Sequence, residues 1–219
     1  MKKQLYLLLF LCSSTLLTAQ SGLRVGAHNG LHFSTLQFSG SDALDVNSTT
    51  QPLLGYRVGI MLEIPIHARF CLRTGGDFLL SGTKQDLPFS AYTSKLKVYS
   101  FQAPVMLAYS CQYFFVGAGG YGSIAWMGTF EATINKNRSV YSDLGVPNFK
   151  TLTFGSSANN DFSRLDYGMI AELGLRYKYF ELSGYYLHGI RNINPAASEY
   201  RVSVRNRSVG ISLSLICTL

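Results

Sequence analysis

Apolar residues recur at every second position over long stretches of this chain. The clearest stretch is LDYGMIAELGLRYKY at 165–179, where apolar or aromatic residues alternate with mostly Gly and charged residues. The same alternation runs through LRVGAHNGLHFS at 23–34, LGYRVGIMLEI at 54–64 and VGISLSLICTL at 209–219. A period of two predicts β-strands that carry one apolar face.

Eight segments of this kind follow one another along the chain. They span roughly 23–34, 54–65, 69–82, 96–109, 113–128, 164–178, 181–190 and 204–218. Strands of soluble domains are usually about 5–6 residues long, whereas a tilted strand needs roughly 9–11 residues to cross a bilayer. The length of the segments therefore favours strands that cross a membrane.

The connections between these segments alternate in length. Polar stretches at 35–53, 83–95, 129–163 and 191–203 are long, whereas the turns near 66–69, 110–113 and 178–180 are tight. This alternation predicts an all-β fold, an eight-stranded antiparallel up-and-down transmembrane β-barrel with short periplasmic turns and long extracellular loops.

Such a barrel requires the last strand to close the ring against the first, because an open sheet edge is not tolerated in lipid. We expect the closing strand to face lipid with its apolar row of Val209, Ile211, Leu213, Leu215 and Leu219. In the fifth strand both faces are apolar, and we assign the lipid face to Phe114, Val116, Ala118, Ile124 and Trp126.

Composition agrees with the strand pattern. Of 219 residues, 47% are hydrophobic and 14% charged, and 21 Gly, 14 Tyr and 14 Phe favour strands and turns over helices. The first residues predict a secretory signal peptide at 1–19, in which Lys2 and Lys3 precede the apolar run 5–11 and the chain is cut after Ala19. Residues 20–219 then form a single exported barrel domain, with no later apolar run of about 18 residues that would make a membrane helix.

The polar sides of the strands carry charges that would point into a narrow lumen. These candidate lumen residues are Arg57, Glu63, Arg73, Asp77, Asp166, Glu172, Arg176 and Glu181. An unpaired charge in such a place is costly, so we predict an internal salt-bridge network. The interior of an eight-stranded barrel is just wide enough for side chains to fill it, so we expect no open pore.

Three arginines lie near the expected extracellular rim of the last strand. Arg201, Arg205 and Arg207 are candidate contacts to lipopolysaccharide phosphates. A solvated basic edge that keeps the rim out of lipid is an equally good interpretation.

An ordered set of motifs resembles a known family. These motifs are LRVGAHNGLHFS, GYRVGIMLEIPIHARFCLRTGGDFLLSGTK, FQAPVMLAY followed by VGAGGYG, LDYGMIAELGLRYKYFELSGYYLHGIRNI and the terminal strand. Together they are similar to the porin-family outer-membrane β-barrel domain that includes PorT-like proteins, over nearly the whole mature chain. The resemblance implies a barrel in the outer membrane of a Gram-negative cell, surrounded by lipid and lipopolysaccharide and inserted by the barrel-insertion machinery. It also implies envelope or secretion-system proteins as partners.

Other chemistry is poorly supported. The glycines of GAGGYG at 117–122 match G-x-G-x-x-G, but no βαβ unit surrounds them, and Gly in a tightly curved barrel wall is the better explanation. His28 and His32 would lie roughly 13 Å apart on a strand, too far for one metal ion. We therefore expect no catalytic residues, no cofactor, no metal and no nucleic-acid partner.

Three classes of function stay open. The first is a non-enzymatic barrel that serves envelope structure, surface interaction or secretion assembly. The second is a small lipid-modifying barrel enzyme, although no G-x-S-x-G motif occurs. The third is a soluble secreted β-barrel that binds a small hydrophobic ligand, and the charged row opposite the apolar row argues against it.

Overall fold

The computed structural model describes residues 22–39, 50–87, 92–134, 149–157, 159–194 and 203–219. The predicted signal peptide and Arg201 lie outside these residues. Within the described part of the chain, no helix is long and apolar enough to span a membrane.

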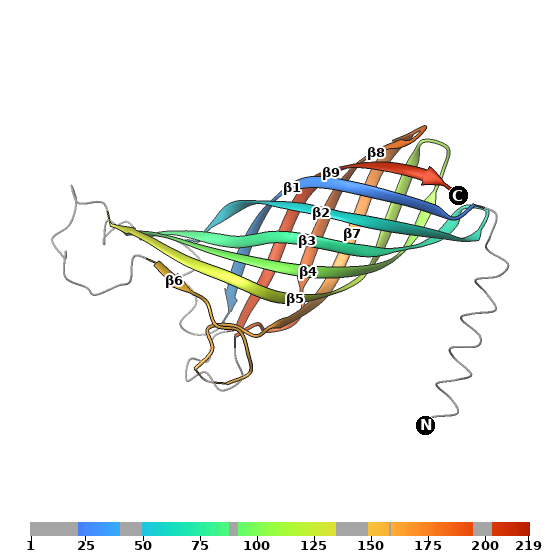
Figure 1. Ribbon diagram of the computed structural model, residues 1–219. Coiled ribbons are helices and arrows are strands. Elements are labelled where there is room, and N and C mark those ends of the chain that lie inside the picture. Colours follow the sequence, from blue (N-terminus) through green and yellow to red (C-terminus); the bar gives the residue numbers. More distant parts are fainter. Residues whose placement is uncertain (1–21, 40–49, 88–91, 135–148, 158, 195–202) are drawn as a thin grey trace, which may run out of the picture.

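Eight long antiparallel strands close into one ring (Figure 1). They are β1 (Arg24–Ser39), β2 (Thr50–His67), β3 (Phe70–Leu87), β4 (Tyr92–Ser110), β5 (Phe114–Ile134), β7 (Leu165–Tyr177), β8 (Phe180–Gly189) and β9 (Ser203–Thr218). The short strand β6 (Phe149–Thr151) pairs only with the far end of β5. Each long strand pairs with its neighbour in sequence, and β5 pairs directly with β7.

The ring closes through β1 and β9, as the alternation predicts. Their pairing runs from Arg24 opposite Thr218 to Ser39 opposite Ser203. Figure 1 shows the C-terminus at the same end of the barrel as the short β2–β3, β4–β5 and β7–β8 turns. In the β7–β8 turn, Lys178 adopts a φ of 52°.

The strands extend further into the expected loops than the sequence analysis predicts. The stretch 83–95 was expected to be an open loop, but β3 continues to Leu87 and β4 begins at Tyr92. Likewise β1 and β2 occupy both ends of the expected loop 35–53, and the stretch 129–163 contains the end of β5 and all of β6. The reason is that antiparallel hydrogen bonding continues where the side chains become polar, as in the pair Lys84 and Lys95.

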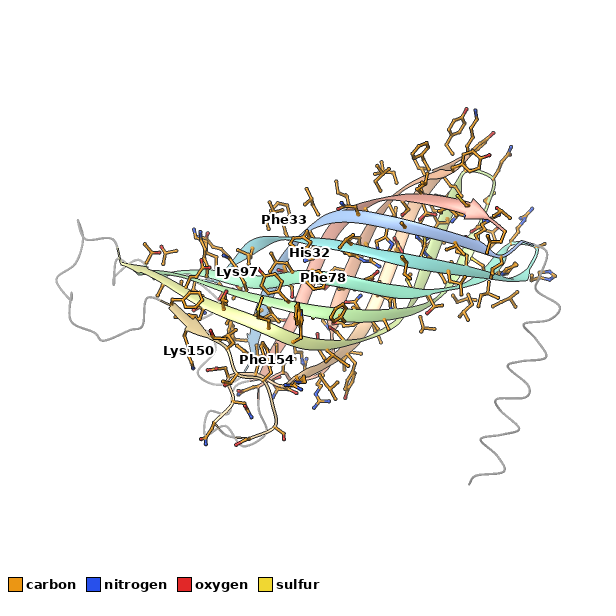
Figure 2. The ribbon with its side chains drawn as sticks, in the orientation of Figure 1. His32, Phe33, Phe78, Lys97, Lys150 and Phe154 are labelled. Atoms are coloured by element: carbon orange, nitrogen blue, oxygen red, sulfur yellow. The ribbon has the colours of Figure 1, made fainter. Side chains whose placement is uncertain are left out.

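The outer surface of the ring is apolar. Exposed side chains include those of the closing strand, namely Val209, Ile211, Leu213, Leu215 and Leu219, and the five residues assigned to lipid on β5. Adjacent residues alternate: His32 is 1% exposed and Phe33 is 56% exposed, and Figure 2 shows the two side chains on opposite sides of β1. A water-soluble protein would not leave so large a continuous apolar surface uncovered.

Aromatic side chains gather at two levels of this surface. Phe70, Tyr109, Tyr113, Phe114, Tyr177 and Phe180 lie beside the short turns, and Phe33, Tyr56, Tyr99, Phe101, Trp126, Tyr167 and Tyr186 lie nearer the other end. Phe114 and Trp126 are separated by 12 positions of one strand. At about 3.3 Å per residue and a tilt of about 40°, this separation is roughly 30 Å, enough for an apolar band of about 25 Å.

A β-bulge in β5 explains one irregularity of this surface. Ala125 pairs with Ser100 and Met127 pairs with Tyr99, which leaves Trp126 as the extra residue. As a result Trp126 and its neighbour Met127 are both exposed, although simple alternation would place one of them inside.

Candidate functional site: the charged lumen of the barrel

The half of the lumen nearest the short turns contains a buried cluster of ion pairs. Arg73 on β3 lies 2.5 Å from Glu181 on β8 and 3.5 Å from Glu63 on β2. Arg176 on β7 lies 2.6 Å from Glu63 and 2.5 Å from Glu181. These contacts join β2 and β3 to β7 and β8, so the cluster connects opposite walls across the interior.

Two further charged residues belong to this cluster. Glu172 lies 3.7 Å from Arg73 and accepts a hydrogen bond of 2.7 Å from the hydroxyl of Ser183. At the periplasmic mouth, the half-exposed Arg24 lies 3.4 Å from Glu63. Arg73 therefore faces three carboxylates, those of Glu63, Glu172 and Glu181.

Asp77 is the centre of a second buried cluster. The Arg57 guanidinium contacts its carboxylate through Nη2 at 2.6 Å and donates a hydrogen bond from Nε at 2.8 Å. His28 Nε2 lies 2.8 Å from the other oxygen of Asp77. On its opposite side, Arg57 lies 4.7 Å from the ring centroid of Tyr185, whose hydroxyl is 3.0 Å from His32 Nδ1.

The eighth candidate residue, Asp166, lies apart from both clusters. Its carboxylate accepts a hydrogen bond of 3.2 Å from the Tyr121 hydroxyl. Within the described residues Asp166 has no ion pair. The structure thus joins seven of the eight candidate lumen charges to ion pairs and leaves Asp166 with a neutral partner.

Besides Tyr121, two aromatic residues of the lumen were missed by the sequence analysis. Phe115 is 1% exposed, and its ring lies 4.7 Å from Arg73 and 5.5 Å from Arg176. Tyr185 contacts both Arg57, through its ring, and His32, through its hydroxyl. Both residues occupy inner positions of alternating strands, so strand parity could have found them. Their cation–π contacts add to the stability of the buried guanidinium groups.

The lumen also holds the three residue types of a hydrolytic triad. Ser214 on β9 lies directly opposite His28 on β1, and His28 contacts Asp77. However, the Ser214 hydroxyl has no hydrogen-bond partner among the described residues, and it is 1% exposed. Asp77 is also neutralised by Arg57. The described residues therefore do not place Ser214, His28 and Asp77 in a hydrogen-bonded triad.

A separate segment covers the extracellular mouth of the lumen. Residues 152–157 and 159–164 fold back over it, and Phe154 and Phe162 line a small apolar cavity of about 40 Å³ together with Leu36, Leu96 and Ile193. Figure 2 shows Lys150 and Phe154 on this side of the barrel. The segment is attached by backbone hydrogen bonds from Leu152 to Gly128 and from Ser163 to Ile193.

A polar clasp holds this covering segment in shape. Lys150 forms an ion pair with Asp161, and the amide and hydroxyl of Thr153 each donate a hydrogen bond of 2.9 Å to the same carboxylate. Partial burial opposes ionisation of Asp161, but these bonds outweigh it and hold the pKa of Asp161 below its usual value. The carboxylate is therefore charged at neutral pH, and the clasp is intact there.

Two of the candidate rim arginines, Arg205 and Arg207, face outward rather than into the lumen. Arg205 is exposed and Arg207 is partly exposed, both on the outer side of β9 beyond Val209. Arg207 lies opposite His188 on β8 and Thr35 on β1. Arg201 lies outside the described residues.

No group of three His, Cys, Asp or Glu side chains in the described residues is arranged to hold a metal ion.

A closed ring, an apolar outer band and a charged interior define an integral membrane β-barrel. The chain belongs to the outer membrane protein β-barrel domain family, whose family model matches residues 18–194. It is a protein of the outer membrane.

Solved structures of three outer-membrane proteins are similar in fold. Ail, the attachment invasion locus protein of Yersinia pestis, is 12% identical, with a TM-score of 0.44 over 89% of this chain and 99% of that chain. Neisserial surface protein A is 15% identical, with a TM-score of 0.45 over 88% and 96%. OprG from Pseudomonas aeruginosa is 12% identical, with a TM-score of 0.42 over 91% and 98%. No curated protein matches this chain at a significant level.

Proposed function

We propose that this protein is a non-enzymatic outer-membrane barrel with a closed lumen, which acts through its extracellular surface rather than by conducting solutes. The buried ion-pair cluster around Arg73 carries this proposal, because it joins opposite walls of the barrel. The covering segment, residues 152–157 and 159–164, supports it at the extracellular mouth. The buried position of Ser214 and His28 supports the absence of a hydrolytic activity.

Envelope structure, surface interaction and secretion assembly are the roles that suit such a barrel. The motif resemblance to PorT-like proteins favours secretion assembly among them. In each role the long strands β2–β5 and residues 149–157 and 159–164 supply the extracellular contact surface (Figure 1).

A closed lumen predicts the absence of conductance. Purified protein reconstituted into planar bilayers is expected to give no large, stable conductance steps, because ion pairs and aromatic rings fill the interior. A general porin reconstituted in the same way is the positive control. Reproducible large steps from the wild-type barrel would contradict the proposal.

We also propose that Arg205 and Arg207 on the outer side of β9, together with Arg201, contact lipopolysaccharide phosphates. Replacing Arg201, Arg205 and Arg207 together by Gln is expected to weaken lipopolysaccharide co-purification, since each Arg near an anionic surface contributes about 1 kcal/mol. Lys178→Gln removes one charge at the opposite end of the barrel and is expected to leave co-purification unchanged. Equal lipopolysaccharide recovery from wild type and triple variant would favour the solvated-edge interpretation instead.

A further inference from the structure

The lipid-facing wall of the barrel contains a groove. It has a volume of about 540 Å³ and crosses β3, β4, β5 and β7. Its apolar lining is formed by Gly76, Phe101, Ala103, Gly122, Ile124 and Leu165, and its polar lining by Asp77, Gln102, Ser123, Asp166, Tyr167 and Arg191. This volume lies within the range of about 300–1,000 Å³ that is typical of small-molecule sites.

Small residues form the floor of this groove. Gly122 pairs with Ala103 on one side and with Tyr167 on the other. Gly76 precedes Asp77, which pairs with Gln102, so Gly76 is level with Ala103. The row of Gly76, Ala103 and Gly122 is therefore continuous across three strands.

Neither crowding nor backbone conformation requires glycine at the two ends of this row. A Cβ atom built on Gly76 or Gly122 would have no neighbour within 4 Å, whereas one built on Gly119 would lie 2.0 Å from the carbonyl oxygen of Val105. Close packing of the curved wall thus explains Gly119 but not Gly76 or Gly122. Glycine inside a strand costs stability, so these two positions keep the groove open at an energetic cost.

The groove rises from the middle of the membrane toward the extracellular side. Gly76 lies 6 positions after Phe70, which begins β3 at the periplasmic end, whereas Tyr167 lies 10 positions before Tyr177, which ends β7 there. Tyr167 therefore lies about four positions farther from the periplasmic end than Gly76, which corresponds to a rise of roughly 10 Å for strands tilted by about 40°.

A guanidinium group stands at the upper end of the groove. Arg191, which also lines the groove, lies with its Cζ 5.7 Å from the ring centroid of Tyr167. Its backbone nitrogen donates a hydrogen bond of 3.2 Å to the carbonyl of Tyr167. Arg is well suited to bind phosphate in a bidentate manner, and this Arg lies at the level of an aromatic ring typical of the membrane interface.

We propose that the groove binds one membrane lipid, with an acyl chain over Gly122, Ala103 and Gly76 and a phosphate head group at Arg191. The apolar floor matches the chain, and the guanidinium of Arg191 matches the phosphate. Of the two carboxylates that also line the groove, Asp77 is paired with Arg57 and Asp166 accepts a hydrogen bond from Tyr121. Phospholipid and lipid A share this chemistry. The site depends on the outer surface of the barrel and not on the closed lumen or on the arginines of β9, so each of these proposals is tested separately.

Native mass spectrometry of the full-length barrel, extracted from Gram-negative outer membranes in mild detergent, tests this site. Gly122→Leu places a side chain in the groove and is expected to remove most of the bound lipid. Gly184→Leu is the matched control. A Cβ atom built on Gly184 of β8 would lie 3.9 Å from the carbonyl oxygen of Gly210, so this position also has open space, but it lies outside the groove. The heat-dependent shift on gels confirms that each variant is a folded barrel.

A second pair of variants tests the head-group contact. Arg191→Gln is expected to lower lipid occupancy about fivefold, equivalent to about 1 kcal/mol. Lys95→Gln, which removes an exposed charge on β4 outside the groove, is expected to leave occupancy unchanged. The adduct mass distinguishes phospholipid from lipid A, and either one supports the proposal. Unchanged lipid binding in Gly122→Leu, detergent adducts only, or a groove-dependent dimer of this chain would overturn it.

Discussion

Arg73→Met is expected to lower the free energy of unfolding of the barrel by about 3–5 kcal/mol, because removing one partner of a buried ion pair leaves uncompensated charge. Arg73 is 4% exposed and faces the carboxylates of Glu63, Glu172 and Glu181. Methionine has a similar shape, so the loss of charge rather than of volume dominates. Denaturant titration of protein refolded into lipid or detergent, followed by the heat-dependent gel shift, measures the change.

An external ion pair gives the matched control for Arg73→Met. Lys97 lies 2.7 Å from Glu131 on the outside of the barrel, where both side chains are about one-third exposed (Figure 2). Lys97→Met is expected to cost only about 0–1 kcal/mol, since water screens exposed pairs. Adding Glu172→Gln to Arg73→Met removes the carboxylate whose ion pair is with Arg73, whereas Glu63 and Glu181 keep Arg176 as a partner, and it should restore part of the stability. Equal effects of Arg73→Met and Lys97→Met would contradict the buried network.

Ile60→Arg is expected to destabilise the barrel in a bilayer by about 2–4 kcal/mol, the cost of an Arg at the lipid-facing midplane. The Ile60 side chain is 65% exposed on the outer face of β2, between the two aromatic levels. Folding titrations into liposomes measure this cost directly.

Ile66 lies on the same strand as Ile60 but at a different depth in the membrane, so Ile66→Arg is the matched control. It is 61% exposed and lies beside the periplasmic β2–β3 turn, so Ile66→Arg is expected to cost about 0–1 kcal/mol. Two equal values would mean that the membrane does not surround the band between the aromatic levels. A large cost at Ile60 and a small one at Ile66 locates the bilayer on the barrel.

The alternation of side chains along each strand allowed much of the fold to be predicted from the sequence. Successive side chains of a strand point to opposite faces, so the alternation around Leu31, Phe33 and Ile60 already separates the lipid face from the lumen face. The same local rule placed Glu63, Arg73 and Glu181 inside. The eight strands followed from this alternation, and the three tight turns followed from the alternating lengths of the connections. The bulge at Trp126 shows where strict alternation fails.

Only the tertiary structure shows which residues contact one another across the barrel. Arg73 and Glu181 are 108 positions apart, and their contact depends on the stagger and closure of the whole ring. For the same reason the sequence did not reveal that Asp166 pairs with Tyr121, or that Phe115 lies between two guanidinium groups.

The sequence by itself therefore determined the face on which most strand residues lie, because that choice depends on the two-residue period of a strand wherever no bulge interrupts it. The tertiary structure decided the contacts that run around or across the ring: the ion-pair partners in the lumen, the segment over its mouth and the groove from Gly76 to Arg191. These contacts depend on register between strands that are distant in sequence, which no local period specifies.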